Sequence, residues 1–292
     1  MATAVIDGID TRYEVIGSGP PLLMYAPGGF DATIEKWSTQ GVYAKIKLLD
    51  HLPKKYTCIV FDRRECGQSG GRVERVTWAD YVAQGTGLLD HLGIARAHIM
   101  GGCMGCCPVA AFGVAHPERV LSMILFWPVG GAKYRISSHQ RFAEHLAFVA
   151  QNGLAAVVEV VQKAGKSFGA DPRGGPWASV IKRDRAFAEG YAKLDVEAYR
   201  LTAGVMGRTL FDRDTAPGAE PEDLMRLAVP ALVVPGRDAS HATSAARYLE
   251  ECLPGAEYWD VPVADQTEAT TRRRIIEFLD KTAVDESRKV TV

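Results

Sequence analysis

Uninterrupted apolar runs alternate along the chain with stretches whose apolar positions repeat at helical spacing. Buried strands are predicted at the apolar runs 21–26, 57–62, 121–127 and 230–235, and in the run that ends at Gly101-Gly102. A last strand is predicted at 257–263. Helices are predicted at 40–52, 77–91, 243–253 and 267–279. Apolar strands separated by helices indicate a parallel sheet that is covered on both faces. The pattern therefore predicts an α/β fold with a mostly parallel central sheet flanked by helices.

The pattern changes over residues 130–220, where helical periodicity dominates and strand-like runs are missing. Gly/Pro-rich breaks interrupt this region at 169–176 and 216–221. We predict that 130–220 is a helical cap inserted into one α/β core, which 1–129 and 221–292 form together.

One thiol stands between the strand that ends at Gly101-Gly102 and a helix of small residues. Gly101-Gly102-Cys103-Met104-Gly105 has the G-x-S-x-G spacing of a nucleophile elbow, with cysteine in place of serine. Glycine suits the positions two residues before and after the nucleophile, because a side chain there would collide with the crossing strand and helix. The amino end of a helix also favours a thiolate. We therefore predict that Cys103 is a nucleophile.

The composition and net charge of the chain limit the kinds of molecule that we expect it to bind. The formal net charge is -1, which gives no broad attraction to nucleic acid or to an anionic membrane, so we expect a small-molecule substrate. No secretory signal is visible and no apolar run approaches the ~20 residues of a membrane span, so we expect a cytoplasmic location. The six cysteines are scattered or crowded, which fits reduced thiols better than a disulfide framework. The oligomeric state stays open, a homodimer included.

In their order along the chain, the motifs resemble those of the α/β-hydrolase superfamily over nearly the whole sequence. They are a glycine turn at 27–30, Asp-Arg-Arg-Glu-Cys-Gly-Gln-Ser at 62–69, the elbow, the helical insertion and Gly-Arg-Asp at 236–238. The resemblance implies the α/β-hydrolase fold and is much less specific for the chemistry. We expect neither a cofactor nor a metal to be needed.

The resemblance gives the turn Pro27-Gly28-Gly29-Phe30 a catalytic role. In the family, a turn at this place supplies one amide of the oxyanion hole, and the residue after the nucleophile supplies the other. Here the first amide would come from Gly29 or Phe30 and the second from Met104. Taken alone, the same turn would only end a strand.

The family's acid position falls on Asp238, which could instead be a loop-capping aspartate. The family's histidine should follow the last strand, where this sequence has Asp265-Gln266, and no histidine occurs beyond His241. A thiol, unlike a serine hydroxyl, can be partly ionised without a base, so a cysteine nucleophile is chemically coherent with the missing histidine. We predict His241 as the base that remains, with His139 and His145 of the cap as alternatives.

Other interpretations of the same residues are less favoured. Cys103 and Cys106 form a C-x-x-C pair, but no thioredoxin-type architecture surrounds them. Together with Cys107 they are also spaced as a soft-metal patch, but no fourth ligand is in view. Arg64 or Glu65 could reach a pocket, although a structural role in the charged loop is favoured.

The leading hypothesis is a hydrolase that acts through Cys103 on a small ester, thioester, lactone or activated carbonyl. An apolar or aromatic substrate is expected from the candidate binding residues Trp127, Tyr134, His139, Phe142 and Trp177. One alternative is a non-covalent lyase, a carbon–carbon bond hydrolase or a cofactor-free oxygenase on the same fold. Another is a non-catalytic ligand-binding protein.

Overall fold

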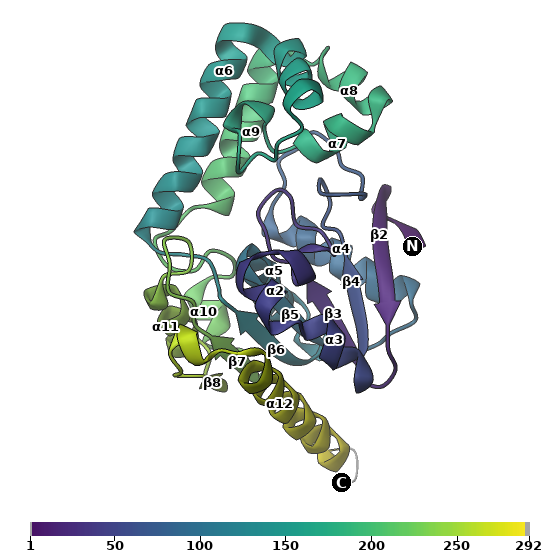
Figure 1. Cartoon of the computed structure of the whole chain (residues 1–292), viewed down its shortest axis with the longest axis vertical. Coiled ribbons are helices and arrows are strands. Elements are labelled where there is room, and N and C mark those ends of the chain that lie inside the picture. Colours follow the sequence, from purple (N-terminus) through teal and green to yellow (C-terminus); the bar gives the residue numbers. More distant parts are fainter. Residues whose placement is uncertain (1, 290–292) are drawn as a thin grey trace.

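A twisted sheet forms the centre of the molecule (Figure 1). The computed structural model describes residues 2–289. Within them the strands are β1 (Ala2–Ile6), β2 (Ile9–Ile16), β3 (Pro21–Tyr25), β4 (Thr57–Phe61), β5 (Ala97–Gly102), β6 (Val120–Phe126), β7 (Ala231–Val234) and β8 (Ala256–Tyr258). Their order across the sheet is β1-β2-β4-β3-β5-β6-β7-β8. Only the β1–β2 and β2–β4 pairs among these strands are antiparallel, which confirms the predicted mostly parallel sheet.

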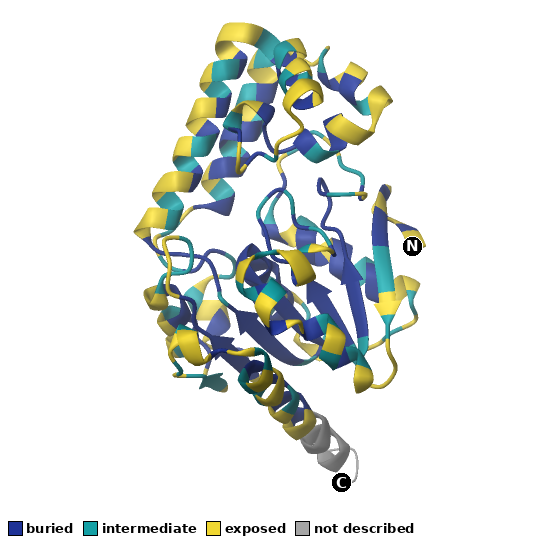
Figure 2. Ribbon diagram, viewed as in Figure 1, coloured by how far each residue is buried: buried dark blue, intermediate teal, exposed yellow. Residues whose placement is uncertain are grey.

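Helices cover both faces of this sheet. On one face α4 (Trp78–His91), α5 (Cys106–Ala115) and α11 (Thr243–Cys252) share an apolar cluster with the strands. On the other face α2 (Gly41–Ile46) and α12 (Glu268–Lys289) do the same. The central strands are therefore buried from both sides (Figure 2), which is why they appear in the sequence as uninterrupted apolar runs.

A layer of helices lies between β6 and β7 in the chain and beyond one edge of the sheet in space (Figure 1). Its helices are α6 (Ala132–Ala164), α7 (Ala178–Arg183), α8 (Arg185–Tyr191) and α9 (Val196–Leu210). All four fall within the segment 130–220 that was predicted as a cap. Although α6 has 33 residues, with a kink at Gly153, no helix in residues 2–289 has both the length and the apolar character to cross a bilayer.

Two predicted elements differ from the structure. The single helix expected at 40–52 is divided into α2 and α3 (Leu48–His51), and a separate short helix, α1 (Lys36–Thr39), precedes it. The division between α2 and α3 follows the backbone, because Lys47 has a φ of +48°. The last strand is only β8, because the N–H groups of Asp260 and Val261 donate to carbonyls two residues earlier and Pro262 follows.

The sharp turn after β5 packs as the glycine spacing predicts. Cys103 has a φ of +55°, which is rare for a residue with a side chain. A Cβ at Gly101 would lie 2.2 Å from the Gly105 carbonyl oxygen, and a Cβ at Gly105 would lie 2.5 Å from the Tyr25 carbonyl oxygen. Both contacts are with backbone atoms, so the turn has no room for alanine at either position.

We predict that Gly105→Ala lowers the free energy of unfolding by about 2 kcal/mol or more, because β3 and α5 must separate to admit the methyl group. Urea denaturation followed by circular dichroism measures the loss.

Gly190→Ala is the matched control, because a Cβ at this position of α8 meets no atom within 4 Å. It should leave stability unchanged or raise it by up to ~1 kcal/mol. Equal midpoints for the two variants would contradict the packing described for the elbow.

Candidate active site

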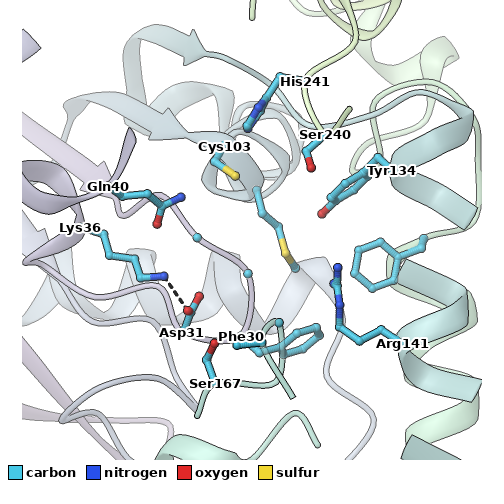
Figure 3. A pocket seen from close by; sticks show the side chains of 16 residues that line it. Phe30, Asp31, Lys36, Gln40, Cys103, Tyr134, Arg141, Ser167, Ser240 and His241 are labelled. Atoms are coloured by element: carbon cyan, nitrogen blue, oxygen red, sulfur yellow. Dashed lines mark ion pairs between the residues drawn. The ribbon is translucent and has the colours of Figure 1, made fainter. Parts of the chain in front are cut away.

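A cavity of about 500 Å³ opens above the elbow, between the sheet and the helical layer (Figure 3). It is lined by Gly28, Gly29, Phe30, Asp31, Lys36, Gln40, Cys103, Met104, Tyr134, Arg141, Ser167, Gly169, Ala170, Phe211, Ser240 and His241. The lining joins the turn after β3, the elbow, helix α6 and the loop after β7. The structure thus brings together the predicted nucleophile, base and glycine turn.

The Cys103 side chain lies at the floor of this cavity. The residue is 9% exposed, so its sulfur is shielded from bulk water and still reaches the cavity. The strained turn directs it out of the sheet, ahead of the first turn of α5. The sulfur is therefore within reach of a molecule bound in the cavity.

His241 lies beside Cys103 and is oriented by Asp238. Its Nδ1 is 2.9 Å from both carboxylate oxygens of Asp238. The Asp238 Oδ1 also accepts hydrogen bonds from the backbone N–H groups of Ser240 and His241, at 2.8 and 2.9 Å. Asp238 therefore caps its own loop and holds the imidazole, which unites the two roles considered for it.

The other imidazole nitrogen, Nε2, is buried and has no well-aligned hydrogen bond to another described residue. It nevertheless lies close enough to the Cys103 sulfur for the two groups to interact electrostatically. Catalytic hydrogen bonds are often long or poorly aligned until substrate is bound. The order Cys103, His241, Asp238 is thus that of a nucleophile, a base and an orienting acid.

The charges of Cys103 and His241 stabilise each other. Burial alone would raise the Cys103 pKa, but His241 and the N–H groups of Gly28 and Met104 bring it below its usual value. Burial alone would lower the His241 pKa, but the thiolate of Cys103 and the carboxylate of Asp238 raise it to about 9. A thiolate–imidazolium pair is therefore favoured near neutral pH.

Two backbone N–H groups face the Cys103 sulfur, and they belong to Gly28 and Met104. The oxyanion hole was predicted from Met104 and from Gly29 or Phe30, and all three residues line the cavity. That assignment stays a prediction, because contacts to the sulfur do not locate the substrate oxygen. The contact of the Gly28 N–H with the sulfur was not predicted, since its direction depends on the backbone of the turn, where Gly28 has a φ of +114°.

Arg63 fixes the glycine turn from behind, a role that sequence reasoning missed. Its side chain is completely buried, and Nη2 donates to the carbonyls of Gly28 (3.3 Å) and Gly29. The guanidinium carbon lies 4.8 Å from the ring centre of Tyr81. No acid within residues 2–289 forms an ion pair with it. Arg63 therefore holds the turn carbonyls away from Cys103 and places an uncompensated positive charge beneath the site.

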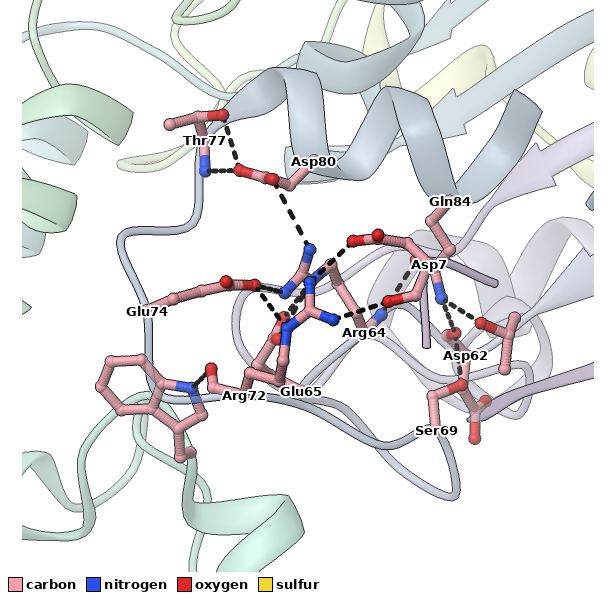
Figure 4. A network of polar contacts seen from close by, with 12 residues as sticks. Asp7, Asp62, Arg64, Glu65, Ser69, Arg72, Glu74, Thr77, Asp80 and Gln84 are labelled. Carbon is pink, nitrogen blue, oxygen red and sulfur yellow. Dashed lines mark hydrogen bonds and ion pairs between the residues drawn. The ribbon is translucent and has the colours of Figure 1, made fainter. Parts of the chain in front are cut away.

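Arg64 and Glu65 do not line the cavity. They form a buried network in which Arg64 pairs with Glu65, Glu74 and Asp80 (Figure 4). Burial raises the Glu65 pKa to about 7, although Arg64 opposes the shift. The network connects the loop after β4 to α4. This position agrees with the structural role that was favoured for Arg64 and Glu65.

Gln266 fills the place where the family's histidine was expected. Its Nε2 donates to the Pro235 carbonyl at 2.8 Å, and its Oε1 accepts from Trp127 Nε1 at 2.7 Å. The Trp127 ring in turn packs against the His241 ring, with centroids 5.4 Å apart. Trp127 was predicted to bind substrate, but it lies outside the cavity lining and supports His241 instead.

Four other candidates from residues 130–220 also lie outside the cavity lining. His139 is directed to the Phe211 carbonyl, 2.8 Å from its Nε2, and Phe142 packs among other phenylalanines. Trp177 is fully buried and donates to the Arg72 carbonyl. His145, which like His139 was an alternative base, is buried against the Tyr199 hydroxyl, and burial lowers its pKa to about 4. The sequence placed these residues on helices but not on a particular face, whereas Tyr134 does reach the cavity.

The neighbouring thiols differ from Cys103. The Cys106 Sγ lies 3.2 and 3.4 Å from the carbonyl oxygens of Gly101 and Phe126, which share its one S–H donor, and burial raises its pKa well above the usual value. Burial likewise raises the pKa of Cys107. No group of three or more potential metal ligands occurs in the described part of the chain. Cys103 is thus distinguished from the adjacent thiols by its low pKa and its access to the cavity.

Comparisons with known proteins agree on the architecture. A family model described as alpha/beta hydrolase fold matches residues 21–148. The matched segment contains the glycine turn and Cys103 but ends before Asp238 and His241, which therefore rest on geometry.

Two curated relatives match parts of the chain. Over 127 residues it is 33% identical to the dihydrolipoyllysine-residue acetyltransferase component of the acetoin cleaving system of Cupriavidus necator, covering 44% of this chain and 32% of that protein. Over 44 residues it is 48% identical to the 2-hydroxy-6-oxo-6-phenylhexa-2,4-dienoate hydrolase of Comamonas testosteroni, covering 15% of each. The matches thus span less than two thirds of either relative.

A solved structure aligns over nearly the whole chain. The enol-lactonase of Burkholderia xenovorans LB400 superposes with a TM-score of 0.59 and 19% identity, covering 96% of this chain and 100% of that one. At this identity the likeness concerns the fold alone.

We predict that iodoacetamide alkylates Cys103 with a rate that rises with pH through an inflection below 9.0, the ordinary thiol value. In His241→Ala the inflection should move upward, because burial then acts without the opposing imidazolium. The rate at pH 7 should fall by about tenfold or more, since each pKa unit changes the thiolate fraction tenfold. Mass spectrometry of the modified peptide measures both effects.

His116→Ala removes a partly exposed imidazole outside the cavity lining and serves as the control. Its pH profile should match that of the unaltered protein. Superimposable profiles for His241→Ala and the unaltered protein would show that His241 does not set the Cys103 pKa.

Proposed function

We propose that this chain, which belongs to the α/β-hydrolase superfamily, is a hydrolase that uses Cys103 to cleave a small activated acyl compound. Its α/β-hydrolase fold is confirmed. The observation that carries the proposal is the Cys103 thiol at the cavity floor, facing His241 and two backbone N–H groups at once. A cysteine that only fills space in the core would not require an imidazole and two N–H donors beside its sulfur.

In the first half of the reaction, the Cys103 thiolate attacks the substrate carbonyl and forms a carbon–sulfur bond. The carbonyl oxygen becomes an oxyanion, for which the candidate donors are the N–H group of Met104 and those of the glycine turn at Gly28, Gly29 and Phe30. The imidazolium of His241 gives its proton to the leaving group as the carbonyl reforms. A thioester on Cys103 and the free alcohol or thiol result.

In the second half, neutral His241 takes a proton from water, and the hydroxide attacks the thioester. The carbon–sulfur bond breaks and releases the acid, while the proton on His241 again faces the Cys103 thiolate. Asp238 keeps its carboxylate against Nδ1 throughout, so Nε2 is the nitrogen that exchanges protons with sulfur, leaving group and water.

A cysteine nucleophile restricts the substrate by its leaving group. In the tetrahedral intermediate, a thiolate departs more readily than an alkoxide, so an unactivated alkyl ester would mostly return to substrate. Thioesters, enol esters and enol lactones carry groups that leave as readily as the cysteine sulfur. These classes are the substrates we propose.

The names of similar proteins support hydrolase activity in general terms. One relative is an acetyltransferase component, another is a hydrolase of a dienoate, and one structural neighbour is an enol-lactonase. Transfer of the acyl group to an acceptor other than water follows the same first half-reaction.

We predict that Cys103→Ala abolishes turnover of a panel of aryl esters, acyl thioesters and enol lactones. The unaltered protein, quenched in acid during turnover, should show the mass of one acyl group on the peptide that contains Cys103. Cys252→Ala removes a buried thiol on α11 and should keep full activity.

The other outcomes separate the alternatives. Turnover that survives in Cys103→Ala, with no adduct on the unaltered protein, would favour the non-covalent lyase, carbon–carbon bond hydrolase or oxygenase. An inert panel together with a Cys103 thiol of ordinary pKa would favour the non-catalytic ligand-binding protein.

A further inference from the structure

One cation in the cavity lining lacks a counter-ion. Arg141, on α6, is half-buried, and no acidic side chain within residues 2–289 forms an ion pair with it. The next acid on its own helix, Glu144, instead accepts a hydrogen bond from Gln140 at 2.9 Å. An arginine that lines a cavity without an acid partner has its hydrogen-bond donors free for a ligand.

The remaining charged residues of the lining are already paired. Lys36 Nζ lies 2.6 Å from Asp31 Oδ2, and His241 is held by Asp238. Arg63, behind the glycine turn, adds a second guanidinium without an acid partner among the described residues. The cavity therefore presents a positive field that the protein itself does not neutralise.

Two hydroxyl groups accompany Arg141. Tyr134 and Ser240 point into the cavity with Arg141 on the side facing away from Lys36 and Asp31 (Figure 3). Neither hydroxyl has a hydrogen-bond partner in the described part of the chain. Burial raises the Tyr134 pKa well above its usual value, while Arg63 and Arg141 act against this shift, so both cations lie within electrostatic reach of the phenol.

An apolar wall lies next to this group. The rings of Phe30 and Phe211 line the cavity, and Tyr134 packs edge-on against Phe211 with centroids 5.6 Å apart. A ligand that matches both surfaces has a short hydrocarbon segment and an anionic end. The guanidinium and two hydroxyls suit a carboxylate, which accepts several hydrogen bonds at once.

We propose that Arg141, Tyr134 and Ser240 bind a carboxylate of the substrate, so that the enzyme takes acyl compounds with a second, ionised carboxyl group. The proposal rests on the function proposed above and replaces the apolar or aromatic substrate expected from the sequence. Monothioesters and enol esters of short dicarboxylic acids have the required chemistry.

The experiment measures how ligands protect Cys103 from iodoacetamide, so it needs no turnover. The probes are glutaramate and glutaramide, which have the same length and differ in one carboxylate, with succinamate, adipamate and their diamides as shorter and longer pairs. For at least one pair, the carboxylate should protect the unaltered protein at a concentration about tenfold lower than the diamide does.

In Arg141→Gln this preference should fall to less than about threefold, and Arg141→Lys should recover part of it because the charge returns without the planar fork. Lys133→Gln is the control, since it removes an exposed cation of the same helix outside the lining and should keep the full preference. Circular dichroism confirms that each variant is folded.

Equal protection by carboxylate and diamide, no protection by any pair, or a preference that persists in Arg141→Gln would overturn the proposal. The result is separate from hydrolysis. A protein that prefers glutaramate but cleaves nothing would refute the hydrolase and keep the carboxylate site. Turnover of neutral substrates without any carboxylate preference would support the hydrolase and refute the carboxylate site.

Discussion

The left-handed backbone of Cys103 is the constraint on which the rest of the site depends. A φ of +55° is costly for a residue with a side chain, and it persists because β3, β5 and α5 approach closely on both sides of the turn. The same approach puts the Gly28 and Met104 N–H groups beside the sulfur. The same backbone packing therefore directs the Cys103 side chain to the cavity and places the N–H donors around its sulfur.

Charged groups around Cys103 stabilise its thiolate form in addition to the backbone N–H groups. The Cys103 sulfur is shielded from bulk water. In such a buried position a thiolate would be unfavourable without partners. His241 supplies the opposite charge, and its own ionisation is sustained by Asp238 on the same loop. Arg63 is buried with no carboxylate among the described residues, so its field adds to that of the N–H groups. The protein accepts an uncompensated buried cation close to the place where negative charge develops.

The sequence predicted what depends on local spacing and on burial. Apolar runs predicted the central strands, and the glycines spaced around Cys103 predicted the elbow. Both patterns reflect contacts that a short segment must make. It did not reveal that the Gly28 N–H faces the Cys103 sulfur, or that Arg63, more than thirty residues away in the chain, binds the carbonyls of that turn. It also assigned Trp127 and Trp177 to substrate, because helical and loop positions do not reveal which way a large side chain points. Arg141 was missed for the same reason.

The placement of acid and base on one loop has a further consequence. In a relay divided between two loops, the relative position of the groups depends on two separate strand ends, and β8 here has only three residues, none of them fully buried. Asp238 and His241 are instead separated by only two residues and joined by a hydrogen bond from the Asp238 N–H to the His241 carbonyl. They would shift as one body if the neighbouring chain relaxed. Evolution could accordingly change the length of β8 without altering the spacing between Asp238 and His241.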